Sequence, residues 1–161
     1  MRLIFNLLAA IVIAVSFASV AFAGTSDEEL MQQYDELVDK WVSDGLNGGA
    51  IHYQTRMWLY KNGIIKDIDQ KSITGHDSLT KHIEQKNHQI PAELSKRDMS
   101  DELLIRQYDE IFDFLTSYGA EADYISKATG GWLFIVGLFG ANANTAHHAD
   151  LLKHIEQKLK K

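Results

Sequence analysis

The 161-residue chain contains no cysteine and a single proline, Pro91. Without cysteine, the chain has no disulfide framework and no N-terminal cysteine that could carry a lipid. The near-absence of proline argues against a disordered chain and against a β fold with many turns. We therefore expect the protein to be stabilised by side-chain packing alone.

Recognisable catalytic motifs are also missing. The sequence has no nucleophile elbow, no HExxH helix, no CxxCH haem-attachment motif, no phosphate-binding glycine loop and no EF-hand spacing. The absence of these motifs favours a non-enzymatic function but does not decide whether the protein is an enzyme. We expect no bound cofactor.

The first 23 residues have the pattern of an export signal. Arg2 supplies a positive N-terminus, residues 3–20 are apolar and uncharged, and Ala21-Phe22-Ala23 forms a small-x-small cleavage site. We expect cleavage before Gly24 and a periplasmic or secreted protein. Because the apolar run is long for a signal, an uncleaved membrane anchor is the alternative.

Acidic residues outnumber basic ones after this segment. The net charge of the whole chain is −6, and loss of Arg2 with the signal removes one positive charge and gives −7. An acidic surface disfavours nucleic acid and anionic lipid as partners. We expect residues 24–161 to form a single domain, because a chain of that length can bury a substantial core.

An internal repeat organises the chain after the signal. SDEELMQQYDELVDKWVSDG, residues 26–45, returns as SDELLIRQYDEIFDFLTSYG, residues 100–119, and KHIEQK occurs at both 81–86 and 153–158. The spacing predicts two repeat units, 26–86 and 100–158, joined by a linker, 87–99. We expect an all-α fold in which these two three-helix units pack as a pseudo-twofold six-helix bundle.

Helical periodicity and capping residues place the predicted helices. Ser26 and Glu29 form a capping box that starts the first helix, and Gly45 ends it. The corresponding helix of the second unit covers 100–119. Further helices are predicted for 50–62, for 76–86 and, as the counterpart of the latter, for 145–159.

The most apolar stretch is ATGGWLFIVGLFGA, residues 128–141. A helix of this length spans roughly 21 Å, less than the roughly 30 Å of a bilayer core, so we predict a buried helix and no stable membrane span after signal removal. A segment dipping into a membrane is the alternative. The glycines at 130, 131, 137 and 140 predict a close approach of another helix.

The second unit is more apolar than the first. Phe114, Tyr118 and Ile135 stand where the first unit has Lys40, Asp44 and Lys61. A helix that is apolar on most sides must be covered by the rest of the chain or by a partner. We predict an apolar interface or cavity, formed by Phe114, Tyr118, Trp132, Ile135 and Phe139.

Seven histidines raise the question of a metal site. Asp150 and His154 lie four residues apart on one predicted helix and could supply two ligands. The preferred interpretation is a solvated or capping histidine stripe, formed by His147, Asp150 and His154, in which Asp150 stabilises protonated His154. We therefore predict no metal site.

The acidic cluster 34–36, repeated at 108–110, has two interpretations. Paired carboxylates could act as acid and base if their pKa values differed. We prefer a solvated helix face whose tyrosines, Tyr34 and Tyr108, are buried and hydrogen-bonded through their hydroxyls.

Together these features predict a small exported helical protein that binds another protein of the cell envelope, as an inhibitor, an immunity-type antagonist or an adaptor. One alternative is a carrier of a small apolar ligand or lipid, with the apolar second unit lining a cavity. The other is a metal-binding or hydrolytic protein that uses the histidine stripe. A homodimer is compatible with each of them.

Overall fold

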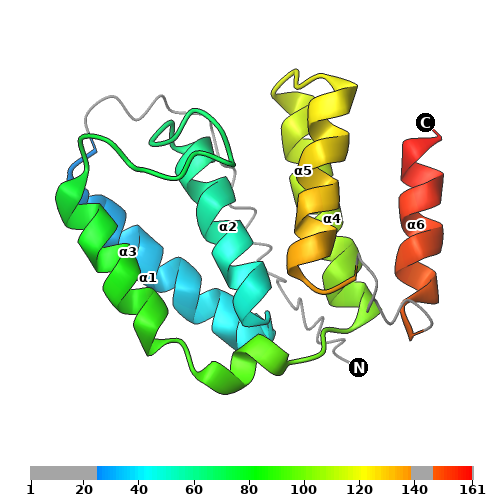
Figure 1. Ribbon diagram of the computed structural model, residues 1–161, viewed down its shortest axis with the longest axis horizontal. Coiled ribbons are helices and arrows are strands. Elements are labelled where there is room, and N and C mark those ends of the chain that lie inside the picture. Colours follow the sequence, from blue (N-terminus) through cyan, green and yellow to red (C-terminus); the bar gives the residue numbers. More distant parts are fainter. Residues whose placement is uncertain (1–24, 139–146, 161) are drawn as a thin grey trace, which may run out of the picture.

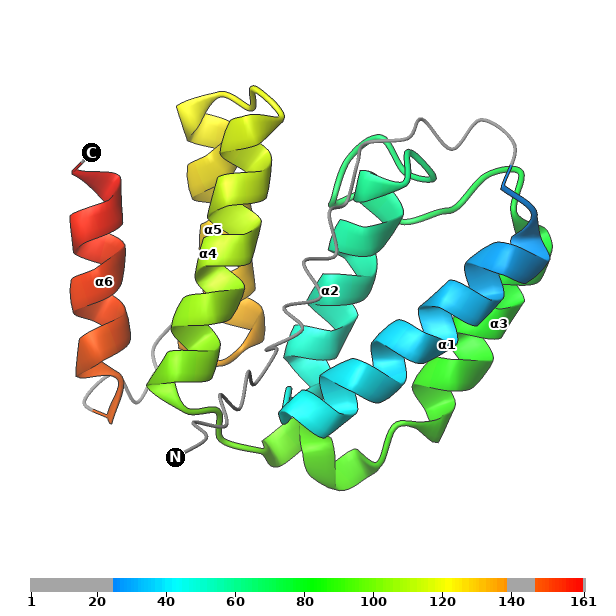
Figure 2. The same ribbon diagram turned by 180° about the vertical axis from the view of Figure 1, so that it is seen from behind.

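The computed structural model describes residues 25–138 and 147–160, and every regular element in these ranges is helical (Figures 1 and 2). The prediction of an all-α chain is confirmed. The elements, in order, are α1 (Asp27–Asp44), α2 (Gly48–Lys61), α3 (Asp77–Gln89), the 3₁₀ helix η1 (Ala92–Lys96), α4 (Asp101–Ser117), α5 (Ala122–Ile135) and α6 (Ala149–Leu159).

The helices form two groups. In the N-terminal half, α1 packs against α2 and α3, and η1 packs against α2; in the C-terminal half, α4 packs against α5 and α6. The two halves meet where α2 contacts α5, at the centre of the molecule in both views (Figures 1 and 2).

Local capping explains where several helices begin and end. The Ser26 hydroxyl accepts the Glu29 N–H, and the Glu29 carboxylate accepts the Ser26 N–H, as predicted for a capping box. Gly45 ends α1 in the left-handed conformation, at φ 94°. α2 begins two residues before the predicted position, because the Asn47 side chain accepts the Ala50 N–H and caps the helix there.

The last helix is shorter than predicted at its N-terminus. It begins at Ala149, whereas the sequence predicted a start at residue 145; residues 145 and 146 lie outside the described residues. The cap is supplied by another helix: Oδ2 of Asp101 in α4 accepts the N–H groups of Asp150 (3.1 Å) and Leu151 (3.2 Å). A cap from a distant part of the chain leaves no local sequence signal.

The apolar stretch 128–141 is not one buried helix, and this prediction needs correction. α5 begins earlier, at Ala122, and ends at Ile135, and Gly137 follows in the left-handed conformation at φ 84°. Trp132 is fully buried, but Phe134 is 66% exposed. Residues 139–141 lie outside the described residues. The helix therefore ends just before Gly137, and only one side of it faces the core.

The close helix approach occurs at a different glycine from those predicted. A Cβ atom on Gly130, Gly131 or Gly137 would meet nothing within 4 Å, and Gly140 lies outside the described residues. A Cβ atom on Gly49, in α2, would lie only 2.6 Å from the carbonyl oxygen of Ile135 in α5. Gly49 is therefore the residue that lets the two halves pack closely.

A continuous hydrophobic core runs through both halves. Its largest fully buried side chains are Trp132, Tyr34 and Tyr108, and the other two tryptophans, Trp41 and Trp58, are buried as predicted. Among the described residues, no helix is both long and apolar enough to cross a membrane.

Candidate functional site

Two polar clusters tie the third helix of each half to the first. In the N-terminal half, Nδ1 of His76 lies 2.7 Å from Oδ1 of Asp27, whose Oδ2 accepts the N–H of Leu79 at 3.2 Å. Further along the same two helices, Nε2 of His82 lies 2.8 Å from Oδ1 of Asp35. Because each pair joins α1 to α3, the histidines hold α3 parallel to α1.

A lysine and a buried tyrosine complete this cluster. Nζ of Lys86 lies 2.9 Å from Asp39 and 3.6 Å from Asp35. The hydroxyl of Tyr34, whose ring is fully buried, lies 3.2 Å from the Thr55 hydroxyl and donates to Oδ1 of Asn87 at 3.0 Å. The predicted hydrogen bonding of Tyr34 is confirmed.

The C-terminal half contains the same histidine–aspartate and lysine–aspartate contacts at corresponding positions. Nδ1 of His148 lies 2.7 Å from Oδ1 of Asp101, and Nε2 of His154 lies 2.8 Å from Oδ1 of Asp109. Nζ of Lys158 lies 2.6 Å from Asp109. Each first-helix position differs from its counterpart by 74 residues and each third-helix position by 72, the offsets of the sequence repeat.

The electrostatics of these clusters favour ion pairing. The hydrogen bond from His76 and the N–H of Leu79 lower the pKa of Asp27 despite its partial burial. Burial opposes the shift at Asp109, but His154 and Lys158 still hold the pKa of that carboxyl below its ordinary value. A lowered carboxyl pKa keeps the group ionised at neutral pH, which suits a structural ion pair rather than proton transfer.

Asp150 and His154, the two candidate metal ligands, contact different residues of α4. His154 faces Asp109 on the neighbouring helix α4, whereas the Asp150 side chain is exposed and its N–H binds Asp101. The partner of His154 is therefore Asp109, a residue that sequence analysis placed on a solvated face. Within residues 25–138 and 147–160, no group of three or more potential ligands lies close enough to hold a metal ion.

The residues predicted to form an apolar interface or cavity lie in different environments. Tyr118 is 59% exposed and Ile135 is 40% exposed. Phe114 is half-buried against Tyr60, with their ring centroids 6.1 Å apart. Trp132 lies inside the core beside Tyr108, and Phe139 lies outside the described residues. Trp132, which is buried in the core, therefore shares no exposed surface with Tyr118 and Ile135.

Exposed apolar side chains nevertheless gather in the C-terminal half. Three of them, Phe134, Leu152 and Leu159, are not among the residues that the sequence predicted for an apolar interface or cavity. All large hydrophobic side chains that are exposed among the described residues belong to this half: Tyr118, Phe134, Ile135, Leu152 and Leu159.

Two open hollows of the described surface lie away from these exposed apolar side chains. One of about 250 Å³ adjoins the start of α2 and the end of α3, and it is lined by Gly48, His52, Asn87, Ile90, Pro91, Ala92 and Ser95. A second lies on the exposed side of α1 and is lined by Thr25, Glu29, Gln32, Gln33 and Glu36. Neither reaches Trp132.

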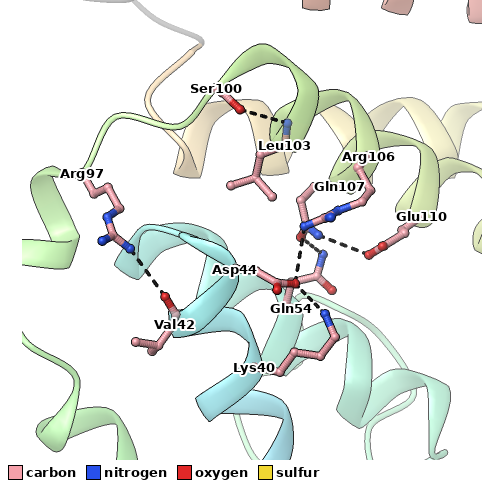
Figure 3. A network of polar contacts seen from close by, with 10 residues as sticks. All are labelled: Lys40, Val42, Asp44, Gln54, Arg97, Ser100, Leu103, Arg106, Gln107 and Glu110. Carbon is pink, nitrogen blue, oxygen red and sulfur yellow. Dashed lines mark hydrogen bonds and ion pairs between the residues drawn. The ribbon is translucent and has the colours of Figure 1, made fainter.

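Polar side chains cross the contact between the halves (Figure 3). Nε2 of Gln54 donates to Oε1 of Gln107 where both side chains are buried, and Nε2 of Gln107 donates to Glu110 at 3.2 Å. Nearby, Arg106 of α4 lies 3.4 Å from Asp44 of α1. The buried amide pair fixes the register of α2 against α4, because either partner alone would lose its hydrogen bond.

The chain matches no protein-family model, no curated protein and no solved structure. Its function has to be inferred from its own residues.

Proposed function

We propose that this protein is a helical binding protein that contacts another protein through the exposed apolar side chains of its C-terminal half. The observation that carries the proposal is the uneven distribution of those side chains. The N-terminal half has Asp44, Tyr60, Lys61, Thr80 and Asn87 at the corresponding positions. Burying apolar area contributes about 25 cal/mol per Å², so these side chains supply a driving force for association.

The filled core favours this function over a carrier of an apolar ligand. A carrier needs a cavity of several hundred Å³ lined by apolar side chains. The space around Trp132 is occupied by Tyr108 and other core residues, and the two hollows described above lie elsewhere. The second alternative, a metal-binding protein, lacks support from the contacts of His154.

We further propose that residues 26–86 and 100–158 are two copies of one three-helix unit related by an approximate twofold axis. The support is the recurrence of the histidine–aspartate and lysine–aspartate contacts at the offsets of the sequence repeat. An experimental structure tests this proposal: the helices of the two copies should superpose in order, and a different helix order would contradict it.

We also propose that the protein acts outside the cytoplasm, in the periplasm or beyond, on the strength of its N-terminal sequence. The intact mass of the protein recovered from the cell envelope should correspond to a chain that begins at Gly24. Recovery of the uncleaved chain in the membrane pellet would identify residues 1–23 as an anchor instead.

Site-specific photo-crosslinking tests the binding function. A photoreactive phenylalanine analogue would replace Phe134, the most exposed large hydrophobic side chain of the described residues, and in a matched control it would replace the exposed Lys153 of α6. After irradiation of intact cells, we expect a discrete protein adduct from position 134 and none from position 153. An adduct of twice the chain mass would identify a second copy as the partner, and equal labelling at both positions would contradict the proposal.

A further inference from the structure

One end of the N-terminal half is covered by the segment that follows α3. Leu94 and Met99 of this segment are buried, and Ser95 packs against Gly48 at the start of α2. Sδ of Met99 accepts the N–H of Asn47 at 3.4 Å. Residues 90–99 therefore act as a cover over the end of α1, the start of α2 and the end of α3.

The same segment also supplies a positive charge. α1 has no basic residue in its last turn, where the helix dipole places a partial negative charge. Nη1 of Arg97 lies 3.5 Å from the carbonyl oxygen of Val42 and fills this role. The cover thus combines apolar side chains with one guanidinium group.

The corresponding end of the C-terminal half is open. The repeat offsets match Asn47 to Glu121 and Asn87 to Leu159. Asn47 is buried and Asn87 is half-buried, whereas Glu121 is exposed and Leu159 is 61% exposed. Figure 1 shows the start of α5 and the end of α6 at the top of the view, and no other described segment crosses them there.

We propose that this open end binds a short segment of a partner protein that carries apolar side chains and a lysine or arginine, in the manner of residues 90–99. The inference rests on the proposed binding function and assigns a place and a chemistry to the partner. The open end is defined by Glu121, Ala122, Asp123, Ser126 and Leu159.

Both parts of that chemistry follow from the residues. Burying the Leu159 side chain is favourable only against apolar atoms. Asn87, its counterpart in the N-terminal half, instead accepts a hydrogen bond from the Tyr34 hydroxyl. The carboxylates of Glu121 and Asp123 are exposed, and α4 has no basic residue in its last turn. Among the described residues, Lys61 of α2 lies over the Phe114 ring in this turn, 4.7 Å from its centroid. The hydrogen bonds to the last carbonyls of α4 come from hydroxyl and backbone N–H groups and from no Lys or Arg of the described residues. A cation from outside would therefore bind this end as Arg97 binds the carbonyl of Val42.

The experiment uses the full chain with a photoreactive residue in place of Ser126, beside the open end. This variant is expressed in the cells that produce the protein. After irradiation, the crosslinked peptide is sequenced by mass spectrometry. We expect a peptide from one other protein that contains at least two large apolar residues and a lysine or arginine. An acidic peptide, a lipid, or a peptide of this chain would overturn the inference.

Two substitutions on α6 test whether Leu159 takes part in the contact. Leu159→Ser should reduce the yield of the adduct about tenfold, the effect expected when one leucine contact is lost. Lys153→Ser changes an exposed side chain of the same helix, α6, that is not one of the exposed apolar residues, and it should leave the yield unchanged. Each variant is first shown to melt at the temperature of the parent chain, so that a loss of yield is not a loss of fold. Equal loss in both would overturn the inference.

Comparison with the crosslinks at position 134 separates this inference from the proposed function. An adduct from position 134 without one from position 126 would leave the binding function standing and refute the open end as its site. The absence of adducts from both positions would refute both.

Discussion

The carboxylate of Asp101 bonds to His148 through one oxygen and caps helix α6 through the other. Oδ1 lies 2.7 Å from Nδ1 of His148, and Oδ2 accepts two backbone N–H groups at the start of α6. A single side chain of α4 thereby fixes the position and the first turn of a helix 47 residues away. Asp27 holds α3 in the same way through His76 and the N–H of Leu79.

Substitution of Asp101 should therefore destabilise the C-terminal half. We expect Asp101→Ala to lower the free energy of unfolding by about 1–2 kcal/mol, the range for loss of a helix cap, as measured by urea denaturation. Asp98→Ala is the control, since Asp98 is exposed and lies 3.7 Å from the other ring nitrogen of His148. Its effect should stay within about 0.5 kcal/mol, and equal losses from both variants would contradict the capping role.

Acid should weaken the fold through the same aspartates. The pKa values of Asp27, Asp101 and Asp109 are lowered in the folded protein, so their contribution to stability is fully present above the unfolded pKa, about 4. It is lost as pH falls below that value and through the lowered folded pKa. Urea titrations between pH 6 and 3 should show a smaller loss of stability for Asp109→Asn than for the parent chain. Identical pH profiles would contradict this prediction.

The close contact at Gly49 predicts opposite effects for two glycine substitutions. Gly49→Ala places a Cβ atom 2.6 Å from the Ile135 carbonyl oxygen and should cost about 1–3 kcal/mol through overpacking. Gly131→Ala adds a methyl group in open space within α5 and should stabilise the protein by about 0.5–1 kcal/mol. Chemical denaturation of both variants measures the difference, and a stabilising Gly49→Ala would show that α2 and α5 are not in close contact.

The buried amide pair between the halves should show strong coupling. Gln54→Ala leaves Oε1 of Gln107 without its donor, and we expect a loss of about 1–3 kcal/mol in unfolding free energy. The double variant Gln54→Leu/Gln107→Leu removes both polar groups and should cost less than the single substitution. A double-mutant cycle with Gln54→Leu and Gln107→Leu measures the coupling, and additive effects would contradict a direct contact.

Several boundaries of the fold were predictable because they depend on residues close in sequence. The capping box of Ser26 and Glu29 spans three positions, and Gly45 ends α1 because of its own backbone freedom. The start of α6 was not predictable in this way, because its cap comes from Asp101. The closely packed Gly49 was missed for the same reason, since its neighbour Ile135 belongs to another helix.

For the candidate sites, too, some properties depend on local sequence and others on tertiary packing. The sequence by itself determined that the chain is helical, that α1 begins at the capping box of Ser26 and Glu29, and that the C-terminal half is the more apolar one, because these properties depend on local order and composition. Only the tertiary structure decided that His154 faces Asp109 and that Trp132 is buried while Phe134 and Leu159 are exposed. Helical periodicity indicates which residues share a face, but the packing of neighbouring helices determines which part of that face is covered.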